Sequence, residues 1–251
     1  MDDLFKAMQN ARHCIVLTGA GVSTLSGIRD FRGKNGLYKE KNAEKIFDID
    51  CFNRDPSIYY NAARVFIYER EEKKPSIVHN VLAQLEQLSL IKAVITQNID
   101  SLHRKAGTVA LIEIHGSLAV HYCPRCTHAP PMELKEVIDI VQSGSLPRCP
   151  LCNTVIRPAI TFFGENLPVK ALRDAQYEAE HADLMVVLGT SLTVNPAAAL
   201  PEITLRHGGS IAIINEGATP FDRFAAFRFD DLQTVFEYIA QKISSRFSTP
   251  Q

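Results

Sequence analysis

The chain has 251 residues, 46% of them hydrophobic and 22% charged, which is enough for one or two domains around a substantial core. Its 27 basic and 28 acidic side chains give a formal net charge of −1, which offers nucleic acids and membranes no overall electrostatic attraction. The first residues do not read as a secretory signal, and no apolar run approaches the roughly 20 residues of a membrane-spanning helix. We therefore expect a cytoplasmic protein that binds neither membranes nor nucleic acids directly, and whose clustered cysteines bind metal or react rather than form disulfides.

Short runs rich in Val, Ile and Leu recur along the chain and predict β-strands at 14–17, 93–95, 111–114, 184–188 and 211–214. Longer amphipathic segments lie between them, such as 76–88 and 168–181, and predict helices. Continuous apolar strands that alternate with helices are typical of a parallel sheet covered on both faces. We therefore expect an α/β fold with a Rossmann-like, doubly wound parallel sheet.

Two stretches interrupt this alternation and predict a smaller inserted domain. Residues 33–75 are polar and aromatic with helical periodicity, so we expect a helical insertion with a flexible loop. Residues 118–157 carry four of the six cysteines and predict a zinc ribbon. The Rossmann-like domain then comprises residues 1–32, 76–117 and 158–251.

Residues 18–33 read TGAGVSTLSGIRDFRG and directly follow the first predicted strand. A Gly-x-Gly turn at this place lets backbone N–H groups approach a pyrophosphate, although a tight turn that only happens to contain glycine is an equally good alternative. The usual dinucleotide fingerprint is not matched, because Thr24 replaces its third glycine and no clear acid-ended second strand follows. An ordinary hydride-transferring dehydrogenase is therefore disfavoured.

Two C-x-x-C pairs, separated by residues 127–148, give the strongest physical signal in the sequence. Each pair offers two thiolates on one tight turn, and two pairs complete a tetrahedral zinc site. Four sulfur ligands leave no open position, so the zinc ion would be structural; a pair of redox dithiols is the alternative. Cys14 and Cys51 lack such spacing and are expected to be buried thiols. The predicted ligands are Cys123, Cys126, Cys149 and Cys152.

Polar segments follow four of the predicted strands, at the ends where open α/β sheets bind ligands. They are residues 96–103, 113–117, 189–198 and 215–217. Each alone could be an ordinary loop, and a single strand-end histidine such as His115 is more often structural than catalytic. Together with the glycine turn, however, five polar strand ends converge on one edge and predict a ligand site.

Several motifs occur in the order found in the sirtuin family of NAD-dependent protein deacylases, and the resemblance runs from about residue 11 to 231. These motifs are GAGVSTLSGIRDFRG, TQNID, HG, the two C-x-x-C pairs, FFGE, GTSLTVNPAA and INEGATPFD. The INEGATPFD stretch and the compact length resemble the bacterial and archaeal deacetylase branch. Arg29, Ala159 and Thr161 depart from the commoner family residues, and Thr161 adds a hydroxyl beside the expected acyl-lysine channel.

The resemblance implies that NAD is a consumed co-substrate. Its pyrophosphate would lie on the glycine turn and the strand end opposite, its adenosine at the last strand ends, and its nicotinamide beside TQNID. Phe31 would cover the reacting face, and Arg32 would supply a cation near the phosphates. The implied NAD-binding residues are Gly19, Ala20, Gly21, Phe31, Arg32, Gln97, Asn98, Ile99, Asp100, Gly189, Thr190, Ser191, Asn215, Glu216 and Asp231.

The same resemblance implies the reaction and the peptide site. His115 would be the general base, with Asn98 and Asp100 as further catalytic residues, and the products would be lysine, nicotinamide and O-acetyl-ADP-ribose. The acetylated lysine side chain of a protein would enter as part of an extended strand between two chain segments. The implied substrate-binding residues are Thr161, Phe162, Phe163, Gly164, Glu165, Val194 and Asn195.

Two other functions remain open from the sequence. One is a zinc-ribbon binding module whose NAD site is vestigial, against which the neutral charge and the presence of His115 argue. The other is a mono-ADP-ribosyltransferase, in which a protein nucleophile captures the ribosyl group of NAD. The fate of labelled NAD distinguishes that activity from deacetylation.

Overall fold

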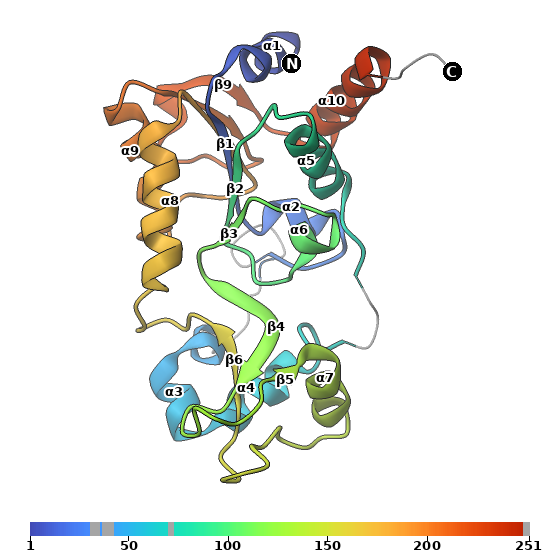
Figure 1. The fold of residues 1–251 in the computed structure, drawn as a ribbon, viewed down its shortest axis with the longest axis vertical. Helices are drawn as coiled ribbons and strands as arrows, with labels where there is room; N and C mark the ends of the chain where they lie inside the picture. The colour runs from blue at the N-terminus through green and yellow to red at the C-terminus, as the bar shows by residue number, and fades with distance from the viewer. Residues whose placement is uncertain (31–35, 37–42, 70–72, 248–251) are drawn as a thin grey trace.

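The computed structural model describes residues 1–30, 36, 43–69 and 73–247. Its larger part is built on a six-stranded sheet in which every neighbouring pair of strands is parallel (Figure 1). In spatial order the strands are β3 (Leu111–Glu113), β2 (Ala93–Thr96), β1 (Cys14–Thr18), β7 (Leu184–Leu188), β8 (Ser210–Ile214) and β9 (Ala225–Phe229). The predicted α/β fold is confirmed. The strand order reverses between β1 and β7, and open sheets bind ligands at such a switch point.

Alternate residues of the central strands face two separate cores. Val16 and Val186 pack into the core on one face, whereas Ile15 and Met185 pack into the core on the other. The first core is covered by α1 (Asp2–Asn10), α5 (Ile77–Gln87) and α10 (Leu232–Phe247), and the second by α8 (Val169–His181) and α9 (Leu200–Arg206). In Figure 1 these two groups of helices lie on opposite sides of the sheet.

A smaller lobe lies below the large sheet in Figure 1. Its antiparallel sheet has the order β5 (Met132–Glu133), β4 (Gly116–Tyr122), β6 (Arg157–Ile160). Beside it lie a 3₁₀ turn (Ala43–Phe47) and the helices α3 (Ile49–Arg54), α4 (Pro56–Ala63) and α7 (Leu134–Gln142). Buried aromatic rings, including Phe52, Tyr59, Tyr60 and Phe162, form much of its core. The domain boundaries remain a prediction. The predicted boundaries at 117/118 and 157/158 fall within β4 and β6.

Local sequence accounts for several helix starts in and beside this lobe. Asp48 caps α3 by accepting from the N–H of Cys51 at 2.8 Å. Asp55 caps α4 and is followed by Pro56, whose fixed φ suits the first helical position. Ser76 and His79 form a capping box at the start of α5. Short helical turns complete the described chain: α2 (Gly21–Thr24), α6 (Leu102–Lys105) and 3₁₀ turns at Ala197–Ala199 and Asp222–Phe224.

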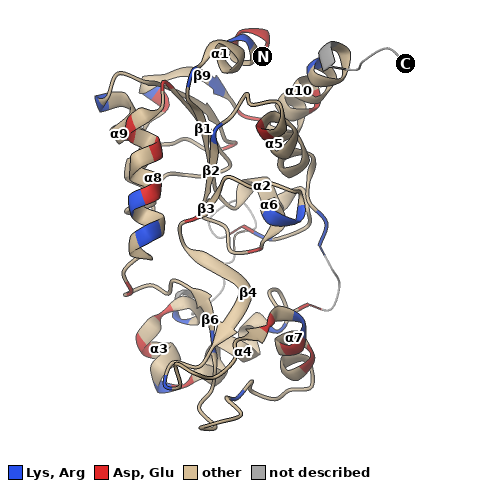
Figure 2. Cartoon of the chain, viewed as in Figure 1, with Lys and Arg blue, Asp and Glu red and all other residues tan. Residues whose placement is uncertain are grey.

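Charged side chains of both signs are interspersed over the described surface. Figure 2 shows this on α8, where Lys170 lies 2.5 Å from Asp174 one turn away. The interspersion agrees with the near-zero net charge of the sequence. Among the described helices, none combines the length and the apolar character that crossing a membrane requires.

Candidate active site

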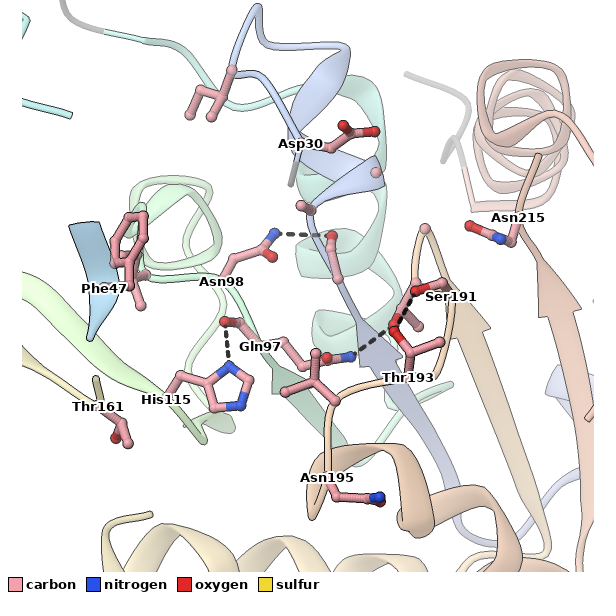
Figure 3. Close-up of a pocket in the computed structure, with 18 of the residues that line it drawn as sticks. Asp30, Phe47, Gln97, Asn98, His115, Thr161, Ser191, Thr193, Asn195 and Asn215 are labelled. Atoms are coloured by element: carbon pink, nitrogen blue, oxygen red, sulfur yellow. Dashed lines mark hydrogen bonds between the residues drawn. The ribbon is translucent and has the colours of Figure 1, made fainter. Parts of the chain in front are cut away.

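The carboxyl ends of the large sheet and the smaller lobe enclose a cavity of about 1970 Å³ (Figure 3). Ordinary ligand sites have volumes of roughly 300–1,000 Å³, so this cavity has room for two ligands side by side. Of the predicted catalytic, NAD-binding and substrate-binding residues within the described chain, all but Asp100 line it. Those that do are Gly19, Ala20, Gly21, Gln97, Asn98, Ile99, His115, Thr161, Phe162, Phe163, Gly164, Glu165, Gly189, Thr190, Ser191, Val194, Asn195, Asn215, Glu216 and Asp231. Phe31 and Arg32 lie outside the described residues.

Glycines allow two strand ends to approach closely at the switch point. A Cβ on Gly19 would lie 2.6 Å from the Cβ of Thr190, and one on Gly21 would lie 2.6 Å from the Cα of Gly189. The N–H groups of Gly19 and Gly21 donate to the carbonyls of Leu188 and Gly189, both at 2.9 Å. These two N–H groups therefore already have acceptors, which the sequence pattern did not reveal.

Asn98 is fixed in the cavity wall by its side-chain amide. Its Nδ2 donates to the carbonyl of Gly19 at 3.0 Å and to Ser23 Oγ at 3.1 Å, so its Oδ1 is the atom left for a ligand (Figure 3). Ser23 Oγ in turn donates to Asp100 Oδ2 at 2.6 Å. Asp100 is thus two hydrogen bonds away from Asn98 in the cavity wall, with Ser23 between them. Burial raises the pKa of Asp100 despite the bond from Ser23.

A buried chain of hydrogen bonds supports Asn98 from beneath. Thr18 Oγ1 donates to Thr96 Oγ1 at 2.8 Å, and Thr96 Oγ1 also accepts from the N–H of Asn98 at 3.1 Å. Because a hydroxyl has only one hydrogen, His103 Nε2, which lies 3.0 Å from Thr18 Oγ1, must be the donor of that pair. Burial lowers the pKa of His103 to about 3, so the ring is neutral. Thr18, Ser23 and Thr96 lie inside the quoted motifs, but sequence reasoning gave them no role because their hydrogen bonds join distant parts of the chain.

His115 follows β3 and presents a free nitrogen to the cavity. Its Nδ1 lies 2.9 Å from the carbonyl oxygen of Gln97, which can only accept, so Nδ1 carries the hydrogen (Figure 3). Burial lowers the pKa of His115, an effect that outweighs the bond to Gln97. At neutral pH the ring is therefore uncharged, with an unprotonated Nε2 that can accept a proton.

The predicted peptide edge, residues 161–165, is anchored at several points. The N–H of Thr161 donates to the carbonyl of His115 at 2.9 Å, which ties this edge to the histidine. The N–H of Phe163 donates to the carbonyl of Phe47 at 2.7 Å. Phe162 is buried among aromatic rings, whereas Phe163 is exposed. Val194 and Asn195 line the same cavity, and Figure 3 shows Asn195 and Thr161 near one end of it.

The remaining predicted residues lie along the other strand ends. Gln97 Nε2 donates to Thr190 Oγ1 at 3.1 Å, which links the ends of β2 and β7. Asn215, after β8, donates from Nδ2 to the carbonyl of Gly217 at 2.7 Å. The carboxylate of Asp231 accepts from Thr234 Oγ1 at 2.6 Å and from the N–H of Gln233 at 2.8 Å, so it also caps the start of α10.

The four predicted metal ligands come together in the smaller lobe. The Sγ atoms of Cys123, Cys126, Cys149 and Cys152 all lie within 4.8 Å of one another. The Sγ atoms of Cys123 and Cys152 are 3.6 Å apart, close to the edge of about 3.8 Å of a tetrahedron with zinc–sulfur bonds of about 2.3 Å. The four cysteines are positioned to hold one zinc ion, as predicted.

Known proteins resemble this chain along most of its length. The sequence pattern of the Sir2 family matches residues 19–196. An NAD-dependent protein deacetylase of Thermotoga maritima is 47% identical over 230 residues, 92% of each chain. An NAD-dependent protein deacylase of Thermococcus kodakarensis is 40% identical over 86% of this chain and 85% of its own.

Solved structures agree with these sequence matches. A Sir2 structure with a deacetylated p53 peptide and 3'-O-acetyl ADP ribose is 44% identical, with a TM-score of 0.90 over 98% of both chains. A second, of Sir2 with a p53 peptide and NAD+, is 42% identical, with a TM-score of 0.88 over 99% of both chains. The fold, the ordered motifs and the sequence match together lead to one conclusion. The chain belongs to the Sir2 family, the sirtuins.

Proposed function

We propose that this protein is an NAD-dependent protein lysine deacetylase. It transfers the acetyl group of an acetyl-lysine side chain to the ADP-ribose part of NAD, and the products are lysine, nicotinamide and O-acetyl-ADP-ribose. The proposal is supported by relatives of this name that match 92% of the chain, and by a cavity large enough for a dinucleotide and a lysine side chain.

One observation supports the assignment most directly: His115 lines the cavity as a neutral imidazole. Its Nδ1–H is held by the Gln97 carbonyl, so the ring orientation is fixed and Nε2 remains free to accept a proton. We assign this nitrogen the removal of a proton from a ribose hydroxyl of NAD. The lowered pKa of His115 keeps it unprotonated at neutral pH, as a general base must be.

The residues around Asn98 would bind the nicotinamide half of NAD. The free Oδ1 of Asn98 can accept a hydrogen bond from a ribose hydroxyl. Its Nδ2 is occupied by the carbonyl of Gly19 and by Ser23 Oγ, which fixes the orientation of the amide. Asp100 accepts two hydrogen bonds, from Ser23 and from the N–H of Leu102. Since a carboxylate offers about four acceptor positions, it could accept the nicotinamide amide as well. Ile99 would supply the apolar side of that pocket.

The glycine turn and the end of β7 would bind the pyrophosphate. Because Gly19 and Gly21 already donate their N–H groups, the contact is expected from the N–H of Ala20 and from the hydroxyls of Thr190 and Ser191. Asn215, Glu216 and Asp231 line the far end of the cavity and would bind the adenosine. Phe31 and Arg32 keep the roles that the family resemblance implies.

The acetylated peptide would add a strand between Gly164–Glu165 and Val194–Asn195. Thr161, Phe162 and Phe163 would line the channel for the lysine side chain. Four cysteine ligands leave a zinc ion no open position, so we assign the metal a structural role. Four thiols that must stay reduced to bind zinc suit the cytoplasm, the location that we propose.

The test uses NAD labelled in its adenine and a peptide that contains one acetyl-lysine. Deacetylation that requires NAD, with the label recovered in a small acetylated molecule, is the expected result. Label retained on protein would instead support the mono-ADP-ribosyltransferase. If the protein neither consumed NAD nor released nicotinamide, the remaining candidate function would be the zinc-ribbon binding module.

A further inference from the structure

An ion pair between a buried arginine and a partly buried glutamate joins the smaller lobe to the predicted peptide edge. The guanidinium of Arg157, at the start of β6, donates to both carboxylate oxygens of Glu165, at 2.8 and 2.7 Å. The side chain of Arg157 is 11% exposed and that of Glu165 is 26% exposed. A bidentate pair of this kind fixes orientation as well as distance. Burial alone would raise the pKa of Glu165, but the bonds that it accepts hold it below its usual value.

Aromatic rings hold the guanidinium in place. Its central carbon lies 5.1 Å from the ring centre of Phe162, 5.7 Å from that of Tyr122 and 6.0 Å from that of Phe52. These contacts are within the range of cation–π attraction. A planar guanidinium can stack and form a fork at the same time, whereas a lysine ammonium cannot. The position of the Glu165 carboxylate is therefore set by the core of the smaller lobe.

The Glu165 carboxylate also fixes the backbone segment that would bind the peptide. Glu165 Oε2 also accepts from the N–H of Phe162 at 2.9 Å, and the N–H of Glu165 donates to the carbonyl of Phe162 at 3.1 Å. The turn between them places Gly164 at a φ of 93°, a left-handed conformation that glycine adopts without strain. On its other side, the N–H of Ile49 donates to the carbonyl of Phe163 at 3.0 Å. Arg157 thus closes a turn that is anchored on both sides.

We propose that Arg157 is a positioning residue for the acylated peptide: through Glu165 it holds the Phe162–Glu165 turn in the shape to which an incoming strand can hydrogen-bond. The inference rests on the proposed function and adds a residue to its peptide site. It assigns Arg157 no contact with NAD or with the reacting atoms.

The experiment is a kinetic double-mutant cycle with Arg157→Lys, Glu165→Gln and the double variant. We expect each single change to raise the peptide KM about tenfold, with the NAD KM and kcat at saturating peptide changed less than about threefold. Because Arg157 acts through Glu165, the double variant should be no worse than Glu165→Gln alone. Fluorescence anisotropy of a labelled acetyl-lysine peptide should show the same loss of affinity without turnover.

Zinc content and melting temperature are measured for every variant, and Arg54→Gln, at the exposed end of α3 in the same lobe, is the matched control. An unchanged peptide KM, a loss confined to kcat or the NAD KM, or additive losses of about a hundredfold in the double variant would overturn the inference. If Arg157→Lys is unstable, Glu165→Gln breaks the same bidentate ion pair from its partly exposed end, because an amide has one acceptor oxygen and no charge. A native peptide KM in that variant overturns the inference equally. Failure of the proposed function would look different: the unaltered protein would give no product.

Discussion

Thr18→Val tests the buried hydrogen-bond chain beneath Asn98, because valine keeps the shape of threonine and removes only the hydroxyl. Thr18 is fully buried, and its hydroxyl bonds both His103 and Thr96. The variant leaves the Nε2–H of His103 without an acceptor in an apolar setting, which costs about 1–3 kcal/mol. Taking about 2 kcal/mol, and about 2–4 °C per kcal/mol for a chain of this size, the melting temperature should fall by about 4–8 °C.

The assay is thermal unfolding followed by circular dichroism without ligands, with nicotinamide exchange into NAD as the functional readout. Thr18→Ser restores the hydroxyl and should recover most of the lost stability. Thr234→Val removes an exposed hydroxyl on α10 and should change the free energy of unfolding by less than about 0.5 kcal/mol. Exchange should slow in Thr18→Val, because Thr96 holds the N–H of Asn98. A Thr18→Val protein as stable as the native one would refute the hydrogen-bond assignment.

Three further predictions follow from the buried and metal-binding groups. Since burial lowers the pKa of His115 below its usual 6.5, kcat/KM for deacetylation should stay level from pH 8 to 6.5 and fall only at lower pH; a fall beginning above 6.5 would contradict the neutral base. Cys149→Ser should lose zinc by elemental analysis and lower the melting temperature, whereas Cys51→Ser should keep the metal. Burial lowers the pKa of His79 to about 4 and that of His103 to about 3, so the unfolded chain binds more protons below pH 6.5. At pH 5 each ring should therefore cost about 2 kcal/mol of the stability present at neutral pH, and a flat denaturation midpoint between pH 7 and 5 would refute this.

Much of the fold was predictable because buried parallel strands leave continuous apolar runs. All five predicted strands lie in the large sheet, and the polar residues at their ends line one cavity. The edge strand β9 was missed because its sequence, AAFRF, is only partly buried and contains an arginine. The strands β4 and β6 of the smaller lobe were missed for a related reason: they are mixed in polarity and paired across distant parts of the chain.

The candidate site also contains residues that the sequence predicted and residues that it did not. Motif residues such as His115 and the four cysteines were found because their chemistry requires particular residue types at particular spacings. The groups that orient these residues could not be predicted, because every residue has a backbone carbonyl and the sequence does not indicate that the one of Gln97 bonds His115. The pairing of Arg157 with Glu165 likewise depends on a turn whose geometry only the folded chain defines.

The most direct test of the central claim measures three products at once by mass spectrometry, from one acetyl-lysine peptide and NAD. For the native protein, nicotinamide, deacetylated peptide and O-acetyl-ADP-ribose should form in equal amounts. For His115→Asn, none should accumulate at a comparable rate, although NAD still binds and the protein melts near the native temperature. Deacetylation that releases free acetate with NAD intact, or a His115→Asn variant with native turnover, would contradict the account.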